Sequence, residues 1–162
     1  MTGADAIARI LKQEGVDHMG IIPMNTLEEA AAVHGIRPMV FRQERVGVNV
    51  ADGHSRVTNG RGIRVFSMQA GPGAENAYAG VAQAYADSVP ILLLAASARR
   101  DRVGVHPTFS LSRSYSEVTK WSDQMNLVER IPEMMRRAFT KLRTGRPGPV
   151  LLDIPADVLR GE

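Results

Sequence analysis

Glu44 stands at the junction between an apolar segment, residues 38–42, and a stretch rich in small residues that begins at position 44. In the first turn of a helix a carboxylate gains only about 0.3–1 kcal/mol from the helix dipole, so a plain helix-start charge is a sufficient explanation for it. The same carboxylate, secluded from water, is suited to hold or transfer a proton during catalysis. Taken by itself, the position of Glu44 leaves both interpretations open.

A glycine-rich turn, residues 69–76 (QAGPGAEN), is the second candidate for chemistry. It follows a predicted strand and opens a predicted helix, so its backbone N–H groups could face a phosphate or could simply form a tight turn. A dinucleotide fingerprint requires a further glycine where this chain has Asn76, and Pro72 removes one N–H donor. No GxxxxGK[ST] motif occurs, and a dinucleotide-binding oxidoreductase is therefore disfavoured.

Several other chemistries are excluded by residue types and spacing. The chain has no cysteine, which rules out disulfides, thiolate catalysis and cysteine-ligated zinc. No histidine lies three or four residues from another, so no metal site is predicted within the chain. The histidines are His18, His34, His54 and His106. The serines lack the sequence context of a nucleophile elbow.

Charge and hydropathy argue against nucleic acid and membranes as partners of the chain. The net charge is +3, but the arginines are dispersed apart from Arg99, Arg100 and Arg102, and no aromatic residues interleave them, so no nucleic-acid partner is predicted. The first twenty residues contain no uninterrupted apolar run, and the longest such run, residues 89–96, is too short to span a bilayer. We therefore expect no membrane association and, together with the absence of cysteine, a cytoplasmic location.

Hydrophobic periodicity divides the chain into alternating helices and strands. Helices are predicted at residues 2–14, 27–33, 44–58, 74–86 and 131–143. Strands are predicted at residues 16–22, 38–42, 63–68, 91–96 and 149–154, and residues 99–118 are expected to be irregular and polar. The alternation predicts a single α/β domain, residues 1–162, with an open, mostly parallel sheet and helices on both faces. Ligands of such sheets lie at the carboxyl ends of strands, where loops 23–26, 42–45 and 69–76 are expected.

Five segments, in this order, resemble the N-terminal pyrimidine-binding domain of thiamine-diphosphate enzymes, and the match is nearest to the acetolactate synthase and 2-oxoacid decarboxylase branch. They are residues 42–44 (RQE), 51–56 (ADGHSR), 70–76 (AGPGAEN), 87–90 (DSVP) and 145–150 (GRPGPV). The resemblance covers nearly the whole chain and implies the thiamine-diphosphate-binding fold. It also implies that thiamine diphosphate is the cofactor.

The resemblance assigns roles to four residues. The family's glutamate at the position of Glu44 hydrogen-bonds N1′ of the cofactor's aminopyrimidine ring and favours the tautomer whose N4′ removes the proton from thiazolium C2. This catalytic role requires a dry pocket, which the neighbouring apolar residues Val40, Phe41, Val46 and Val48 are expected to provide, and inward-turned Arg42 or Arg45 would oppose it. Pro23, Pro72 and Asn76 are expected to line the pyrimidine pocket beside Glu44.

The chain departs from the family pattern at three places. Gln43 stands where most members have histidine, and residues 21–25 read IIPMN where the family loop reads Gly-x-Pro-Gly. Ser110 follows Phe109 where acetolactate synthases carry a Phe-Gln pair, which weakens a specific assignment to acetolactate synthesis. The Pro23 loop also resembles the corresponding loop of two-subunit sulfopyruvate or phosphonopyruvate decarboxylases. In those enzymes the pyrimidine domain is a separate chain.

The family binds the diphosphate and Mg²⁺ through a Gly-Asp-Gly motif in a different domain, and this sequence contains no such motif. The resemblance therefore implies a shared active site with a diphosphate-binding domain or subunit as partner, a small 2-oxo acid as substrate, and a homo-oligomer paired through the helices after Glu44 and Gly73. The chain ends soon after its last predicted strand, as we expect of a domain cut from a longer protein, and alone it is expected to be inactive. The alternative is a non-catalytic binding or regulatory module that keeps the fold.

Overall fold

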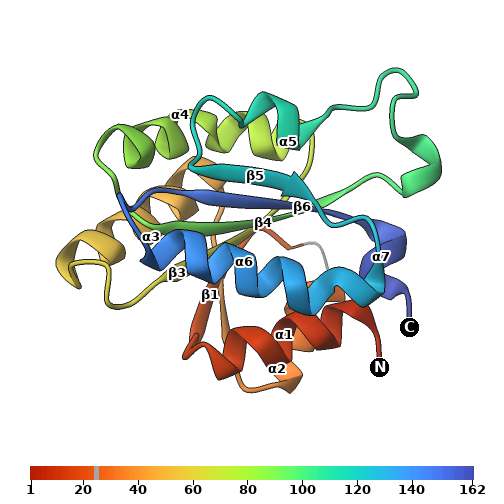
Figure 1. Cartoon of the computed structure of the whole chain (residues 1–162), viewed down its shortest axis with the longest axis horizontal. Coiled ribbons are helices and arrows are strands. Elements are labelled where there is room, and N and C mark those ends of the chain that lie inside the picture. The colour runs from red at the N-terminus through yellow and green to blue at the C-terminus, as the bar shows by residue number, and fades with distance from the viewer. Residues whose placement is uncertain (24–25) are drawn as a thin grey trace.

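The computed structural model describes residues 1–23 and 26–162, which form a six-stranded parallel sheet in the order β2-β1-β3-β4-β6-β5 (Figure 1). Its strands are β1 (His18–Ile21), β2 (Arg37–Val40), β3 (Arg64–Gln69), β4 (Ile91–Ser97), β5 (Trp121–Gln124) and β6 (Val150–Pro155). Every neighbouring pair is parallel, so the predicted parallel α/β sheet is confirmed.

Helices cover both faces of the sheet, as the alternation of elements predicts. They are α1 (Gly3–Gln13), α2 (Thr26–Val33), α3 (Glu44–Val57), α4 (Pro72–Ala86), α5 (Leu111–Ser114), α6 (Ile131–Arg143) and α7 (Ala156–Arg160), with 3₁₀ turns at Arg100–Arg102 and Val128–Arg130. Helices α1, α2, α6 and α7 enclose one hydrophobic core and α3, α4 and α5 enclose the other. Among the described residues no helix is long and apolar enough to cross a membrane.

Strand β4 shows why the central strands read as continuous apolar runs. Leu92 and Leu94 enter the core beneath α1 and α6, whereas Ile91 and Leu93 enter the core beneath α3 and α4. Successive side chains of a strand point to opposite faces, so a strand covered on both sides needs apolar residues at every position.

Helix α1 has a well-defined start and end. Thr2 caps α1 in a capping box with Asp5, and Gly15 follows the helix with a φ of 84° that suits glycine.

The two ends of the chain lie side by side. The N–H of Gly3 donates a hydrogen bond of 2.8 Å to the carbonyl of Gly161, and both termini lie at the same corner of the molecule (Figure 1).

The segment 99–118, expected to be irregular and polar, contributes two anchors to the core, so that expectation is wrong in part. Leu111 and Tyr115 are fully buried, and the Tyr115 hydroxyl donates a 2.5 Å hydrogen bond to the carbonyl of Ala74. Burial raises the pKa of Tyr115 above its usual value. Two apolar anchors, four residues apart among polar neighbours, are too sparse to be recognised as a periodic pattern.

Strand β5 and the exact start of α4 are the other differences. Sequence patterning gives no signal for β5, because its residues WSDQ do not alternate and only pairing with β6 makes them a strand. Helix α4 begins at Pro72 and not at Ala74, because proline is favoured in the first helical turn, where its missing N–H has no helical partner.

Candidate functional site

The order of the strands brings the carboxyl ends of β1, β2 and β3, after which the three loops were predicted, to one edge of the sheet. Strand β1 lies between β2 and β3, and the chain leaves β1 in one direction and β3 in the other, so the crossovers diverge between these two strands. Such a switch point, at the carboxyl ends of the strands, is where open α/β sheets bind ligands. The N–H of Phe41 donates to the carbonyl of Ile21 at 2.9 Å, and the N–H of Ile22 donates to Ser67 at 3.2 Å, which holds the three strand ends together.

Glu44 and Asn76 meet at this edge. Glu44 is the first residue of α3, Asn76 lies in the first turns of α4, and Nδ2 of Asn76 donates a 2.7 Å hydrogen bond to Oε2 of Glu44. Among the residues that the structure describes, Asn76 is the one hydrogen-bond donor to this carboxylate. Two residues that the sequence singles out from separate motifs, 32 positions apart, are therefore in direct contact.

Gly73 makes room for the Glu44 carboxylate. A Cβ at this position would lie 2.9 Å from Oε1 of Glu44 and 3.3 Å from Cβ of Gln69, so any side chain would displace the carboxylate. The carboxylate thus rests against the first turn of α4 while starting α3, and the positive ends of two helix dipoles favour its charge. This contact was not predicted from the sequence, where Gly73 is only one of several glycines in a turn.

Small residues let α3 and α4 pack closely, as their composition predicts. A Cβ at Gly80 of α4 would lie 2.9 Å from Oδ1 of Asn49 and 3.0 Å from Val48 on α3. A Cβ at Gly47 would lie 2.1 Å from the ring of Phe66, so α3 approaches β3 only because this residue is glycine. These contacts fix how α3 and α4, which carry Glu44 and Asn76, lie against each other and against β3.

The dry surroundings expected for Glu44 are only partly present within this chain. Val48 is buried and Phe41 is half-buried, whereas Val40 and Val46 are 66% and 46% exposed, so these two valines do not close a dry pocket around Glu44 within the described residues. Val40 is the last residue of edge strand β2, and Val46 lies in the first turn of α3. Glu44 itself is half-buried.

The two arginines beside Glu44, Arg42 and Arg45, are exposed. Neither makes an ion pair with Glu44 among the described residues.

The two prolines lie at the same edge and are exposed. Pro72 is in the first turn of α4, directly after Gly71, whose φ of 69° is suited to glycine. Pro23 follows β1, while the departure from the family loop at Met24 and Asn25 lies outside the described residues.

A buried carboxyl group that the sequence did not reveal lies behind this edge. Glu28 of α2 is 6% exposed, and Oγ of Ser67 on β3 donates a 3.0 Å hydrogen bond to its Oε1. It resembles an ordinary acidic residue in the first turn of a helix, so nothing in the local pattern marks it. Among the described residues, no cluster of three or more histidines or acids is placed to hold a metal ion.

Comparison with known proteins identifies the family. The profile described as "Thiamine pyrophosphate enzyme, N-terminal TPP binding domain" matches residues 1–127. The chain belongs to the thiamine pyrophosphate enzyme family. The resemblance inferred from the five sequence segments is thereby confirmed, and the parallel sheet with helices on both faces is consistent with the fold of this family.

Relatives of this thiamine pyrophosphate enzyme domain include several acetolactate synthases. The chain is 32% identical over 168 residues to acetolactate synthase isozyme 3 large subunit of Escherichia coli, covering 98% of this chain and 28% of that protein. It is 34% identical over 165 residues to acetolactate synthase 2, chloroplastic, of Nicotiana tabacum, covering 96% of this chain and 24% of that protein. It is 30% identical over 169 residues to the acetolactate synthase large subunit of Buchnera aphidicola subsp. Acyrthosiphon pisum (strain APS), covering 99% of this chain and 29% of that protein. The chain therefore spans less than a third of the length of these relatives.

Proposed function

We propose that this chain is the pyrimidine-binding half of a thiamine-diphosphate-dependent lyase or transferase that decarboxylates or ligates 2-oxo acids. The observation that carries the proposal is the Glu44 carboxylate at the switch point of the sheet, held by Asn76 at 2.7 Å. The names of the relatives, acetolactate synthases, support a 2-oxo acid as substrate. The departures at Gln43 and Ser110 keep the proposal at the level of this class of reaction.

The residues at this edge fit the aminopyrimidine ring of the cofactor. Asn76 donates its hydrogen bond to Oε2 of Glu44, and no described residue donates one to Oε1. Oε1 can therefore accept a hydrogen bond from a ring N–H. When bound, thiamine diphosphate supplies the electron sink for cleavage of the bond next to the 2-oxo carbonyl. Glu44 would hold the proton at N1′, Asn76 would fix the orientation of its carboxylate, and Pro23 and Pro72 would border the ring.

The open side of the site supports the need for a partner. Val40 and Val46 beside Glu44 are largely exposed, and proton transfer by a carboxylate gains from exclusion of water. We propose that a diphosphate-binding domain or subunit covers this edge and carries the ligands for the diphosphate and Mg²⁺. Alone, the chain is then expected to bind the cofactor weakly and to be inactive.

The test replaces Glu44 in the complex of this chain with its diphosphate-binding partner. Glu44→Gln keeps the shape of the side chain and its contact with Asn76 but cannot hold the proton at N1′, so hydrogen–deuterium exchange at C2 of bound cofactor should slow by roughly 10²–10⁴-fold. Folding should be almost unaffected, because the helix-start charge contributes at most about 1 kcal/mol. The matched control is Glu75→Gln, an exposed glutamate in the first turn of α4, which should leave the exchange rate unchanged.

The same measurement separates the enzyme from the inert module. An unchanged exchange rate in Glu44→Gln would overturn the assigned role. A large fall in melting temperature with normal exchange in the folded fraction would mean that Glu44 only supports the fold. Failure of the wild-type complex to bind thiamine diphosphate would favour the non-catalytic binding or regulatory module.

A further inference from the structure

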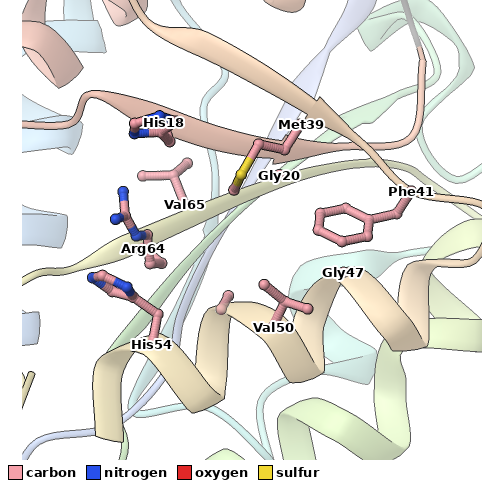
Figure 2. Close-up of a pocket in the computed structure, with 10 residues that line it drawn as sticks. His18, Gly20, Met39, Phe41, Gly47, Val50, His54, Arg64 and Val65 are labelled. Carbon is pink, nitrogen blue, oxygen red and sulfur yellow. The ribbon is translucent and has the colours of Figure 1, made fainter. Parts of the chain in front are cut away.

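A cavity of about 260 Å³ lies on the sheet between α3 and the edge strand β2 (Figure 2). It arises because α3 covers β1 and β3 but leaves the adjoining face of β2 bare. Its lining residues are His18, Gly20, Met39, Phe41, Gly47, Val50, Ala51, His54, Arg64 and Val65. We call this cavity the β2–α3 groove. None of the residues to which the cofactor site is assigned lines it.

The two ends of the β2–α3 groove differ in chemistry. Figure 2 shows the apolar side chains of Met39, Phe41 and Val50 toward one end. His18 of β1, Arg64 of β3 and His54 of α3 gather at the other end. The groove thus offers an apolar body and a nitrogen-rich end, which is the polarity of a site for an amphipathic molecule.

The polar end carries an excess of positive charge. The carboxylate at this end of the groove belongs to Asp17. Oδ1 of Asp17 accepts a 2.8 Å hydrogen bond from Nη1 of Arg64 and lies 3.0 Å from Nδ1 of His18. Both groups hold the pKa of Asp17 well below its usual value. Arg37 lies directly opposite His18 in the register of β1 and β2, hence on the same face of the sheet, so this face carries two arginines, Arg37 and Arg64, against one carboxylate.

Arg64 has hydrogen-bonding capacity beyond its ion pair. Its side chain is only 20% exposed, and of its five N–H donors one is engaged, with Asp17, among the described residues. Burial and the nearby Arg64 lower the pKa of His54, so this ring is predominantly neutral at pH 7. A half-buried guanidinium with unused donors beside an apolar wall is suited to bind a carboxylate.

We propose that the β2–α3 groove binds a small apolar monocarboxylate, with its carboxylate on Arg64 and its hydrocarbon part against Met39, Phe41 and Val50. The molecule is of the size of phenylacetate or a branched short-chain acid, which a cavity of about 260 Å³ accommodates. Phe41 brings one end of this groove close to the carboxyl edge of the sheet, but none of Pro23, Glu44, Pro72 and Asn76 lines the groove, and the proposal does not depend on the function proposed for that edge.

The test is a titration of the full chain with phenylacetate at pH 7, followed by ¹H–¹⁵N NMR. Amide signals of Gly20, Ala51 and Val65 should shift with a dissociation constant below about 1 mM, while those of Glu44 and Asn76 should stay in place. Phenylacetamide, which has the same shape without the charge, should bind at least about tenfold more weakly, as should phenylacetate to Arg64→Gln.

A pair of tryptophan variants on α3 provides the steric control. Val50 is 44% exposed and lines the groove, so Val50→Trp fills it from the solvent side and should abolish binding. Val57 is 83% exposed and lies outside the groove, so Val57→Trp should leave the affinity unchanged. This pair of variants tests whether the ligand binds in the groove even if Arg64→Gln unfolds the chain.

Three results would overturn the proposal. They are equal binding of phenylacetamide, unchanged binding in Val50→Trp, and absence of any shift at concentrations up to about 10 mM, which corresponds to a binding free energy weaker than about −3 kcal/mol. Shifts confined to Glu44 and Asn76 would place the ligand at the other edge and would also count against the groove.

Discussion

Asp153 shows how a single buried carboxyl group can make stability depend on pH. It lies on β6 between β4 and β5, is 2% exposed, and accepts a 3.1 Å hydrogen bond from Nε2 of Gln124. Burial raises the pKa of Asp153, and the hydrogen bond from Gln124 opposes this shift only in part. Between pH 3.8 and the raised value, the folded chain holds a proton that the unfolded chain has released.

The consequence is a predicted loss of stability as pH rises through the pKa of folded Asp153. Asp153→Asn keeps the shape and the hydrogen bonds without a charge, so it should raise the melting temperature at neutral pH by about 2–4 °C for each kcal/mol gained. It should also flatten the fall in melting temperature expected for the wild type as pH rises above 3.8 and through the raised pKa of folded Asp153. Calorimetry across this range checks it, with Asp101→Asn as control, since Asp101 has a side chain 63% exposed. Destabilisation by Asp153→Asn at every pH would mean that the carboxylate is needed in its ionised form.

At the scale of elements, two glycines of α3 have opposite roles. Gly47 lies against Phe66, where a Cβ would come within 2.1 Å of the ring, whereas a Cβ at Gly53 would meet no atom within 4 Å. Helical glycine normally costs stability through its conformational freedom. Only Gly47 therefore has a packing reason to be glycine.

We expect these two positions to respond with opposite signs. Gly47→Ala should lower the free energy of unfolding by about 1–3 kcal/mol, because α3 must move away from the sheet. Gly53→Ala on the same helix should raise it by about 0.5–1 kcal/mol. Urea unfolding of the two variants measures both effects. If Gly47→Ala were neutral, the close approach of α3 to β3 would not be a constraint on the fold.

The same elements show what a sequence can and cannot predict. Continuous or periodic apolar patterns identified β4, α1 and α6, because burial on defined faces leaves a local signature. Strand β5 and the anchors Leu111 and Tyr115 went unrecognised, because their burial depends on partners distant in the chain. Their neighbours in the sequence give no indication of those partners.

The candidate site likewise has residues that the sequence identified and contacts that it could not predict. Glu44 and Asn76 were singled out through the family resemblance, but their 2.7 Å contact and the room left by Gly73 follow from the packing of α3 on α4. The β2–α3 groove had no sequence signal at all. His18, His54 and Arg64 come from three elements and have no recognisable spacing.

At the scale of the whole molecule, α3 and α4 expose several small and apolar side chains. Val46 and Val57 of α3 are exposed, and so are Ala79, Gln83 and Ala86 of α4. Both helices begin at the Glu44 edge, so this surface adjoins the open side of the candidate site. Contiguous small and apolar side chains on an exposed face are typical of surfaces that pair with another protein.

We therefore predict that the chain self-associates through the outer surface of α3 and α4. A two-fold interface uses the same patch on both copies, so Val57→Glu would bring two buried or closely spaced carboxylates to it and should weaken association by at least about tenfold. Val33→Glu is the matched control, because Val33 is 81% exposed, nearly as much as Val57 at 83%, and belongs to α2 on the opposite face of the sheet. Sedimentation equilibrium over a concentration series should show the wild type and Val33→Glu associating alike and Val57→Glu shifted toward the monomer. A wild type that stays monomeric at the highest concentration, or a Val33→Glu variant that dissociates equally, would remove the α3–α4 surface as the interface.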